Sequence, residues 1–384
     1  MSKESMNMNQ LKMSFFSFAI AFMLHLLLFA TAPLSTVMMK EMSLSHAGFA
    51  FIFGIAMISL VASRIPWGII GDHIGFRGAF RIALPLSATA AVIRSFSPGY
   101  STLLITQLLL GFGLSSVLPC LPLLVKKSFM KNLTGFATGL YVAGFAAGNA
   151  TALALTPRLL PIFSWRLILL LYAILPVAIT ILWWLFIPET SFKTKSVKPD
   201  QFKLIFKDRS LWILLILVIA AMGGYDTLAT WIPKIIEMKH LNSSLSTLLP
   251  LGFFFSGPII GVVSDRYINR KTLLAVMGFA TIFSILGIRS NSLVLFNLSL
   301  FFAGFCPNSV LTISLTIPAE QERYASSVGG VVGVISSLGN IGPLILPVIF
   351  GSLIDITGTY QLSLLFIALF SGIIFVLSSR SKYF

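Results

Sequence analysis

Long apolar stretches alternate with short polar ones along most of this chain. A helix needs about 20 consecutive apolar residues to cross a bilayer. Continuous apolar runs of that length favour helices over a barrel as the spanning structure. Twelve such stretches are predicted: 13–36, 47–71, 79–97, 101–125, 134–157, 165–187, 210–234, 246–264, 271–289, 292–317, 325–350 and 358–379. We therefore expect an all-α membrane protein with twelve transmembrane helices.

One polar stretch is longer than all the others and lies near the middle of the chain. It separates six predicted spans from the next six, and it is rich in Lys. The pattern predicts an N-terminal six-helix bundle at 1–188, a cytoplasmic linker at 189–209 and a C-terminal six-helix bundle at 210–384.

The basic residues are distributed unevenly between the two sides of the predicted membrane. Of the 27 Lys and Arg residues, nineteen fall at the termini, in the linker or in loops on its side, and seven fall in the opposite loops. Arg64 lies inside a span. Because Lys and Arg accumulate on the cytoplasmic side, both termini and the linker are predicted to be cytoplasmic, in a multi-pass protein of the cell membrane. The net charge of +15 then reflects topology, so no nucleic-acid partner is expected.

The composition agrees with lipid as the main solvent. Hydrophobic residues make up 57% of the chain and charged residues 10%, against about 25% charged in soluble domains. Cys120 and Cys306 form no CxxC pair, the four His residues lack ligand spacing, and phosphate-loop and nucleophile motifs are missing. We expect no metal, no cofactor and no enzymatic activity.

The second half repeats motifs of the first at a nearly constant offset. Five pairs lie 193 residues apart: Gly68/Gly261, Asp72/Asp265, Arg77/Arg270, Gly111/Gly304 and Ser116/Ser309. A Gly-Asn pair at 148–149 recurs 191 residues later at 339–340. A duplicated six-helix unit is a transporter architecture, and it predicts a substrate site between the halves near the midplane.

The segment 68–77, GIIGDHIGFR, resembles the signature loop of the major facilitator superfamily. Its second copy departs from that loop at the second glycine, where Ile268 or Asn269 stands. Together with the repeat and the twelve spans, the resemblance covers nearly the whole chain. It implies alternating access by rocking of two six-helix bundles, in a protein that functions as a monomer.

The signature segments are the predicted conformational gate. A carboxylate that pairs with Arg or caps a helix N-terminus would hold the cytoplasmic side closed, and glycines would let the helices approach closely. The alternative is that these charges only set topology. The gate residues are Gly68, Gly71, Asp72, Gly75, Arg77, Gly261, Asp265, Arg266 and Arg270.

Two further segments resemble the nitrate/nitrite-porter and cyanate-permease-like branch of this superfamily. They are Arg64-Ile-Pro-Trp-Gly68 and the glycine-rich stretch 144–149. The resemblance implies an anion clamp to which Arg64, Asn149 and Tyr225 can be matched. The second arginine of that clamp is missing, because its position by the repeat offset is Gly257. Nitrate itself is therefore not assured.

Four residues are candidates for substrate binding: Arg64, Asn149, Tyr225 and Asp226. Placing an ionisable side chain inside a bilayer costs about 2.5–3.5 kcal/mol or more, so such a residue is expected to have a structural or functional role. Arg64 would clamp an anion, or it is a structural ion pair or a snorkelling side chain. Asn149 either lines the pathway or bonds across a helix crossing.

Asp226 is the one carboxylate clearly within a predicted span, and it is the candidate for proton coupling. It could also form a salt bridge with Arg64 that substrate displaces. The structural alternative is a polar turn that breaks the helix after Gly223-Gly224.

The prediction for function is a secondary transporter of a small organic or inorganic anion, with proton symport as a candidate mechanism. Its partners are then a small, anionic substrate and the lipid bilayer. The alternatives are an exporter of amphipathic compounds, in which Asp226 attracts a cation, and a membrane sensor that does not transport.

Overall fold

The computed structural model describes residues 8–130, 133–188, 208–266, 269–320 and 328–380, and nearly all of them are helical. The chain divides into two compact units. The first comprises Met1–Thr31 and Ile58–Ser196, and the second comprises Ala32–Met57 and Val197–Phe384. The segment 32–57 thus belongs to the second unit, although it precedes most of the first unit in the sequence.

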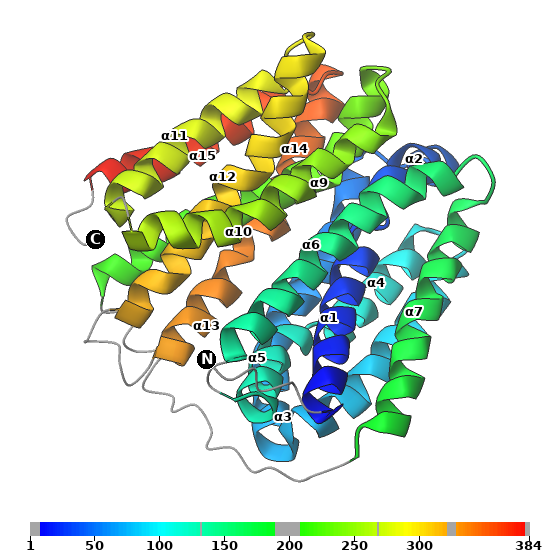
Figure 1. The fold of residues 1–384 in the computed structure, drawn as a ribbon. Helices are drawn as coiled ribbons and strands as arrows, with labels where there is room; N and C mark the ends of the chain where they lie inside the picture. The colour runs from blue at the N-terminus through cyan, green and yellow to red at the C-terminus, as the bar shows by residue number, and fades with distance from the viewer. Residues whose placement is uncertain (1–7, 131–132, 189–207, 267–268, 321–327, 381–384) are drawn as a thin grey trace. The chain divides into compact units, whose positions relative to one another are not determined.

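The first unit is a bundle of apolar helices (Figure 1). Its elements are α1 (Met8–Phe29), α3 (His46–Ser95) from residue 58 onward, α4 (Tyr100–Leu114), α5 (Val117–Ser128), α6 (Thr134–Leu159) and α7 (Trp165–Phe186). Most of these helices are hydrophobic around much of their circumference, as lipid and a packed interior together require.

A close crossing in the first unit is that of α1 and α6, which lie side by side (Figure 1). Gly144 and Gly148 on α6 face the backbone of α1. A Cβ on Gly144 would lie 2.6 Å from the Phe18 carbonyl oxygen, and one on Gly148 would lie 3.0 Å from the Leu26 nitrogen. Glycine is therefore required here by the approach of one backbone to another.

The second unit has more elements. They are η1 (Ala32–Leu34), α2 (Ser35–Met42), the first turns of α3, α9 (Arg209–Met238), η3 (Ser243–Thr247), α10 (Leu248–Arg266), α11 (Arg270–Gly287), α12 (Leu293–Glu320), α13 (Val328–Gly339), α14 (Ile341–Thr357) and α15 (Gln361–Arg380).

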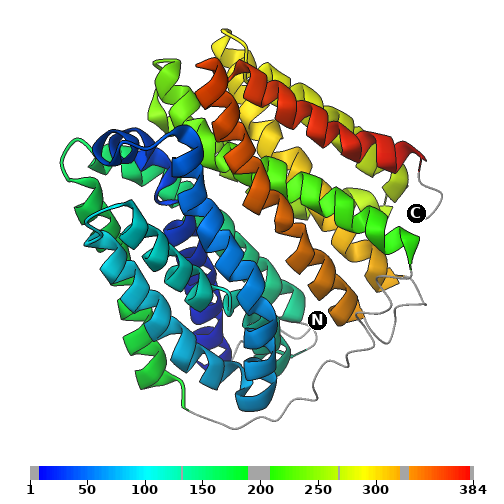
Figure 2. The same ribbon diagram turned by 180° about the vertical axis from the view of Figure 1, so that it is seen from behind.

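The second unit contains a crossing of the same kind, between α9 and α14 (Figure 2). A Cβ on Gly342 of α14 would lie 2.9 Å from the Gly223 Cα of α9. In both units one partner of the crossing is the first helix of the repeat, which is α1 in the first unit and α9 in the second. The other partner is α6, which contains the first Gly-Asn pair, or α14, which directly follows the second.

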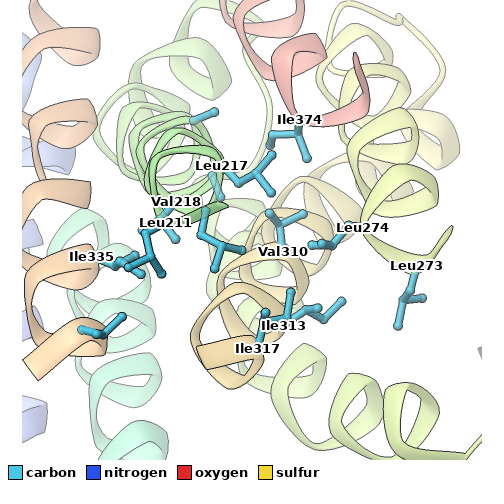
Figure 3. Packing of buried hydrophobic residues seen from close by; sticks show 14 of the residues in the cluster. Leu211, Leu217, Val218, Leu273, Leu274, Val310, Ile313, Ile317, Ile335 and Ile374 are labelled. Carbon is cyan, nitrogen blue, oxygen red and sulfur yellow. The ribbon is translucent and has the colours of Figure 1, made fainter. Parts of the chain in front are cut away.

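Aliphatic side chains from six helices form the core of the second unit (Figure 3). Leu217 and Val218 of α9 lie at its centre. The labelled residues around them are Leu211, Leu273, Leu274, Val310, Ile313, Ile317, Ile335 and Ile374. The cluster joins α9, α10, α11, α12, α13 and α15, and α9 contributes more of its residues than any other helix.

The predicted all-α membrane architecture is confirmed. Within the described ranges, eleven helical segments are long and apolar enough to cross a membrane. The helix α10, with 19 residues, stands at the predicted position of another span.

Two predicted features differ from the structure. The connection between spans 47–71 and 79–97 is shorter than predicted, because α3 (His46–Ser95) consists of two helical parts that meet at a kink at Gly75. The span predicted at 325–350 ends before the helix does, because α14 continues to Thr357 in the structure.

The predicted domain bounds of 1–188, 189–209 and 210–384 remain a prediction. Most of the linker, residues 189–207, lies outside the described residues.

Candidate functional site

Arg64 lies on α3 in the first unit, eleven residues before the bend at Gly75. At 1.5 Å per residue this is about 16 Å along the helix. The residue is only 6% exposed. Trp67, one turn further on, donates a 2.7 Å hydrogen bond from Nε1 to the Phe112 carbonyl oxygen and so fixes α3 against α4 near Arg64. The guanidinium is therefore a buried cation on a helix whose position is set by its neighbour.

Asn149 lies on α6 in the same unit and is fully buried. It follows Gly148, whose missing side chain allows the contact between α6 and α1. This position is compatible with both interpretations of Asn149 from the sequence, namely that it lines the substrate pathway or that it bonds across a helix crossing. Asn340, the residue at the repeated position, donates a 2.6 Å hydrogen bond to the Ser336 carbonyl oxygen, which is a local structural role at the start of α14.

Tyr225 and Asp226 lie on α9 in the second unit. Tyr225 is 4% exposed, and its ring lies 4.7 Å from that of Phe253 on α10. The helix runs unbroken from Arg209 to Met238, so the structural alternative of a broken turn after Gly223-Gly224 is wrong. Thr230 even donates to the Asp226 carbonyl oxygen at 2.8 Å, within the helix. Asp226 thus sits on an intact helix, in mid-span.

The position that corresponds to Arg64 in the second unit carries no cation. A Cβ on Gly257 would meet no atom within 4 Å. The neighbouring residue Ser256 instead accepts a 2.6 Å hydrogen bond from the Asn308 amide, which also donates to the Phe253 carbonyl oxygen at 2.9 Å. The second unit therefore has a neutral polar pair between α10 and α12 beside this position.

The three gate glycines of α3 have different surroundings. A Cβ on Gly68 would meet nothing within 4 Å, so no close approach requires it. A Cβ on Gly71 would lie 3.4 Å from Cys120 Sγ. Gly75 has φ 74° and ψ 164°, a conformation that is essentially restricted to glycine. The signature segment therefore contains the kink at Gly75 at which the two helical parts of α3 meet.

Two of the gate cations are described. The Arg77 carbonyl oxygen accepts a 3.3 Å hydrogen bond from Trp183 Nε1, which joins α3 to α7. Arg270 lies at the start of α11 and donates from Nη1 to Thr316 Oγ1 at 3.0 Å. Asp72, Gly261, Asp265 and Arg266 lie in α3 and α10, but their side chains fall outside the described residues.

A second buried guanidinium was missed by the sequence interpretation, which assigned Arg94 to a loop. Arg94 is fully buried at the end of α3. Its Nη1 donates to the Leu27 carbonyl oxygen at 2.9 Å and to Gln107 Oε1 at 3.2 Å. Leu27 is in the last turn of α1, where a cation is stabilised by the helix dipole. Arg94 therefore has a structural explanation, and no pattern in the sequence distinguished it from a loop cation.

A cavity of about 280 Å³ opens in the second unit, lined in part by Lys239, Ser290, Phe296 and Tyr360. Lys239 Nζ donates to the Ser290 carbonyl oxygen at 2.8 Å and lies 5.4 Å from the Phe296 ring centroid. Burial lowers the pKa of Lys239 and raises the pKa of Tyr360. The lysine is thus engaged in holding the connections of this unit together. In the parts that are described, no group of three or more His, Cys, Asp or Glu residues could hold a metal ion.

Two units of apolar helices, each with a glycine-mediated crossing, define a polytopic α-helical membrane protein. The model of the Major Facilitator Superfamily matches residues 15–322 and 239–381. The chain belongs to this family of transporters.

Curated relatives are similar at low identity. The inner membrane transport protein YnfM of Escherichia coli K12 is 24% identical over 66% of this chain and 63% of its own length. The probable nitrate transporter NarT of Staphylococcus carnosus is 22% identical over 88% of each chain. The cyanate transport protein CynX of Escherichia coli K12 is 22% identical over 89% of this chain and 90% of its own.

Solved structures share the fold. A bacterial homolog of the human lysosomal transporter Spinster, in an inward-facing and occupied conformation, aligns with a TM-score of 0.76. The alignment covers 99% of this chain and 98% of that one at 14% identity. At this identity the likeness concerns the fold alone.

Proposed function

We propose that this transporter moves a small organic or inorganic anion across the inner membrane, and that Arg64 binds the anion. The observation that carries the proposal is the burial of Arg64 on a helix of the first unit, at 6% exposure. Among the described residues, only Arg64 and Arg94 are charged and buried. Arg94 donates to the Leu27 carbonyl oxygen at the end of α1, so we assign a structural role to Arg94 and propose Arg64 as the cation that binds the substrate.

Several relatives are named as transporters of small anions, which supports an anionic substrate. Nitrate and cyanate transporters are among them, as is the nitrite extrusion protein of Bacillus subtilis, which is 22% identical over 92% of this chain. Gly257 replaces the second arginine implied by the resemblance, and the neighbouring Ser256 and Asn308 are neutral. We therefore favour an anion held by one guanidinium over nitrate held by two.

Three further residues complete the proposed set. Asn149 would donate a hydrogen bond from its amide and Tyr225 would present a partly polar aromatic surface. Asp226 is the proposed proton-coupling group, because a carboxylate in mid-span can take up a proton as its environment changes. The gate residues would govern opening of the cytoplasmic side, with both termini on that side and one chain as the working unit.

A thermal-shift screen tests the anion directly. The purified protein is melted with sodium salts of nitrate, nitrite, cyanate, formate and acetate, each compared with sodium chloride. A ligand present at about 100 times its Kd stabilises the protein by about 2.7 kcal/mol, so at least one salt should raise the melting temperature of the wild type. The same salt should leave Arg64→Ala unchanged. An equal rise in both proteins would exclude Arg64 as the anion-binding group.

A further inference from the structure

The cavity of about 280 Å³ in the second unit lies where four helices end or begin. Lys239, which lines it, directly follows α9, and the other lining residues include parts of the connection from α11 to α12 and the residue before α15. The 30 residues of α9 span about 45 Å, against a hydrocarbon core of about 30 Å. Because α9 begins beside the linker, the cavity lies at the opposite membrane surface.

The charge of the cavity favours an anion. Lys239 is the one charged residue in its described lining, and no carboxylate lines it. Lys239 Nζ donates to the Ser290 carbonyl oxygen at 2.8 Å and to the Arg289 carbonyl oxygen at 3.5 Å. An ammonium group has three donors, so one N–H remains for a further acceptor. Burial lowers the pKa of Lys239, since its charge has lost water, and a bound anion would stabilise that charge.

Neutral groups hold the ammonium in place. Lys239 Nζ lies 5.4 Å from the Phe296 ring centroid and 6.0 Å from that of Tyr360, both within reach of a cation–π interaction. The adjoining connection is fixed as well, because Arg289 Nε donates to Gln361 Oε1 at 2.6 Å. Carbonyl oxygens and rings position the cation without cancelling its net charge. The cavity therefore presents a preorganised cation to a ligand.

The border of the cavity indicates what kind of anion it suits. Leu293 lines the cavity and is 52% exposed, and the next residue, Val294, is 70% exposed. Both stand at the start of a segment that is long and apolar enough to cross a membrane, Leu293–Pro318, so their exposed apolar surface is expected to contact lipid. Tyr360 is an aromatic residue of the kind that gathers at headgroup level. The cavity thus combines a cation with an edge that acyl chains cover.

We propose that this cavity binds the phosphate of an anionic phospholipid, with Lys239 as the cation that contacts it and Leu293 beside its acyl chains. The volume is below the about 300–1,000 Å³ of pockets that enclose drug-sized molecules, which suits a headgroup whose chains stay outside. Inorganic phosphate has the same acceptor oxygens but no chains. The site does not include Arg64, so it goes beyond the proposed function and holds whatever the substrate is.

Native mass spectrometry of the full-length protein tests this site. The protein is released from micelles that contain graded amounts of phosphatidylglycerol or of zwitterionic phosphatidylcholine, and the affinity for the first bound lipid is measured. Wild type should bind phosphatidylglycerol about tenfold more tightly than phosphatidylcholine, because the choline cation offsets the phosphate. Lys239→Gln should weaken phosphatidylglycerol binding about tenfold and leave phosphatidylcholine binding nearly unchanged.

Three further variants separate the site from general effects. Lys40→Gln removes an exposed cation from α2, on the same predicted side of the membrane and outside the cavity, so it should bind as wild type does. Asn291→Trp fills the cavity but retains Lys239, and it should lose tight phosphatidylglycerol binding even if Lys239→Gln disturbs the connection that Lys239 holds. Arg64→Ala should keep the lipid, so a failure of the anion proposal leaves this test intact.

Ammonium phosphate added to the wild type distinguishes a lipid from a free ion. Millimolar phosphate should leave phosphatidylglycerol bound, because it lacks the apolar part of the lipid. Displacement of the lipid by phosphate would identify a site for the free ion and overturn the proposal. Equal affinity for the two lipids, or wild-type affinity in Lys239→Gln or Asn291→Trp, would overturn it as well.

Discussion

The two units share their packing but differ in their charge. In the first, α6 crosses α1 through Gly144 and Gly148, and in the second α14 crosses α9 through Gly342 and Gly223. Arg64 of the first unit, by contrast, is matched by Gly257 in the second. A crossing at which one backbone meets another leaves room for glycine only, so duplication preserved it. If Arg64 binds the anion as proposed, its position is under no such packing constraint, and the two halves could differ there.

The largest effect is expected where the units agree. Gly148→Ala and Gly342→Ala each place a Cβ against backbone atoms of the neighbouring helix. Overpacking of this kind costs up to about 3 kcal/mol, and the two substitutions should cost similar amounts. The free energy of unfolding is measured by titration with SDS.

Gly139→Ala is the control for this pair, because a Cβ there would meet nothing within 4 Å. A crossing substitution that behaves like Gly139→Ala would show that the helices are not as close as described. A large difference between the two crossing variants would break the equivalence of the units.

The next largest effect is expected on anion binding when the Arg64 cation is reproduced at the matching position of the second unit. Gly257→Arg places a Cβ where no atom lies within 4 Å, so the start of the new side chain meets no backbone. A second guanidinium should strengthen binding of an oxyanion by about 2 kcal/mol, or roughly thirtyfold. Calorimetric titration with sodium nitrate compares this variant with the wild type. Unchanged or weaker nitrate binding by a folded Gly257→Arg would mean that this position does not face the anion.

Asp226 tests the coupling role assigned to the second unit. Asp226→Asn should remove the pH dependence of anion uptake into proteoliposomes, a change of about tenfold or 1.4 kcal/mol between about pH 6 and pH 8. The unbroken α9 around it makes a folding defect a poor explanation for such a loss. If the variant keeps the wild-type pH profile, coupling passes through another group.

The smallest effect concerns the bend of α3. Gly75→Ala should cost about 1 kcal/mol, since φ 74° with ψ 164° is strained for any residue with a Cβ. Gly68→Ala, in open surroundings, should cost nothing measurable. Apparent melting temperatures distinguish the two. Equal values would show that the signature segment does not need its bend.

Much of the fold could be predicted from the sequence because bilayer thickness and backbone hydrogen bonding restrict the possible structures. The apolar runs predicted the helices, and the 193-residue offset predicted two related halves. The positions of individual side chains were harder to predict. Arg94 resembled any loop cation until its contact with the end of α1 was seen. The connection at Gly75 was predicted to be longer than it is, since the single residue at which two helices meet is not visible in an apolar pattern.

The grouping of residues 32–57 with the second unit could not have been predicted from local patterns. It brings His46 to Asp355, 309 residues away in the sequence. Neither residue lies in a motif, and Asp355 looks unfavourable near the end of its own helix, α14, where the helix dipole opposes a carboxylate. For the candidate site, the sequence predicts only which residues take part: Arg64, Asn149, Tyr225 and Asp226. Their roles depend on the substrate, whose identity cannot be predicted from the sequence.

The most direct test of the anion role is uptake by proteoliposomes that contain wild type, Arg64→Ala or Arg64→Lys at equal protein density. The probe is the radiolabelled form of whichever anion stabilises the wild type in the thermal-shift screen. Arg64 would hold the anion through paired donors that Lys cannot reproduce, so we predict that both variants stay folded and lose uptake by at least about 100-fold. Wild-type uptake by a folded Arg64→Ala protein would contradict the account.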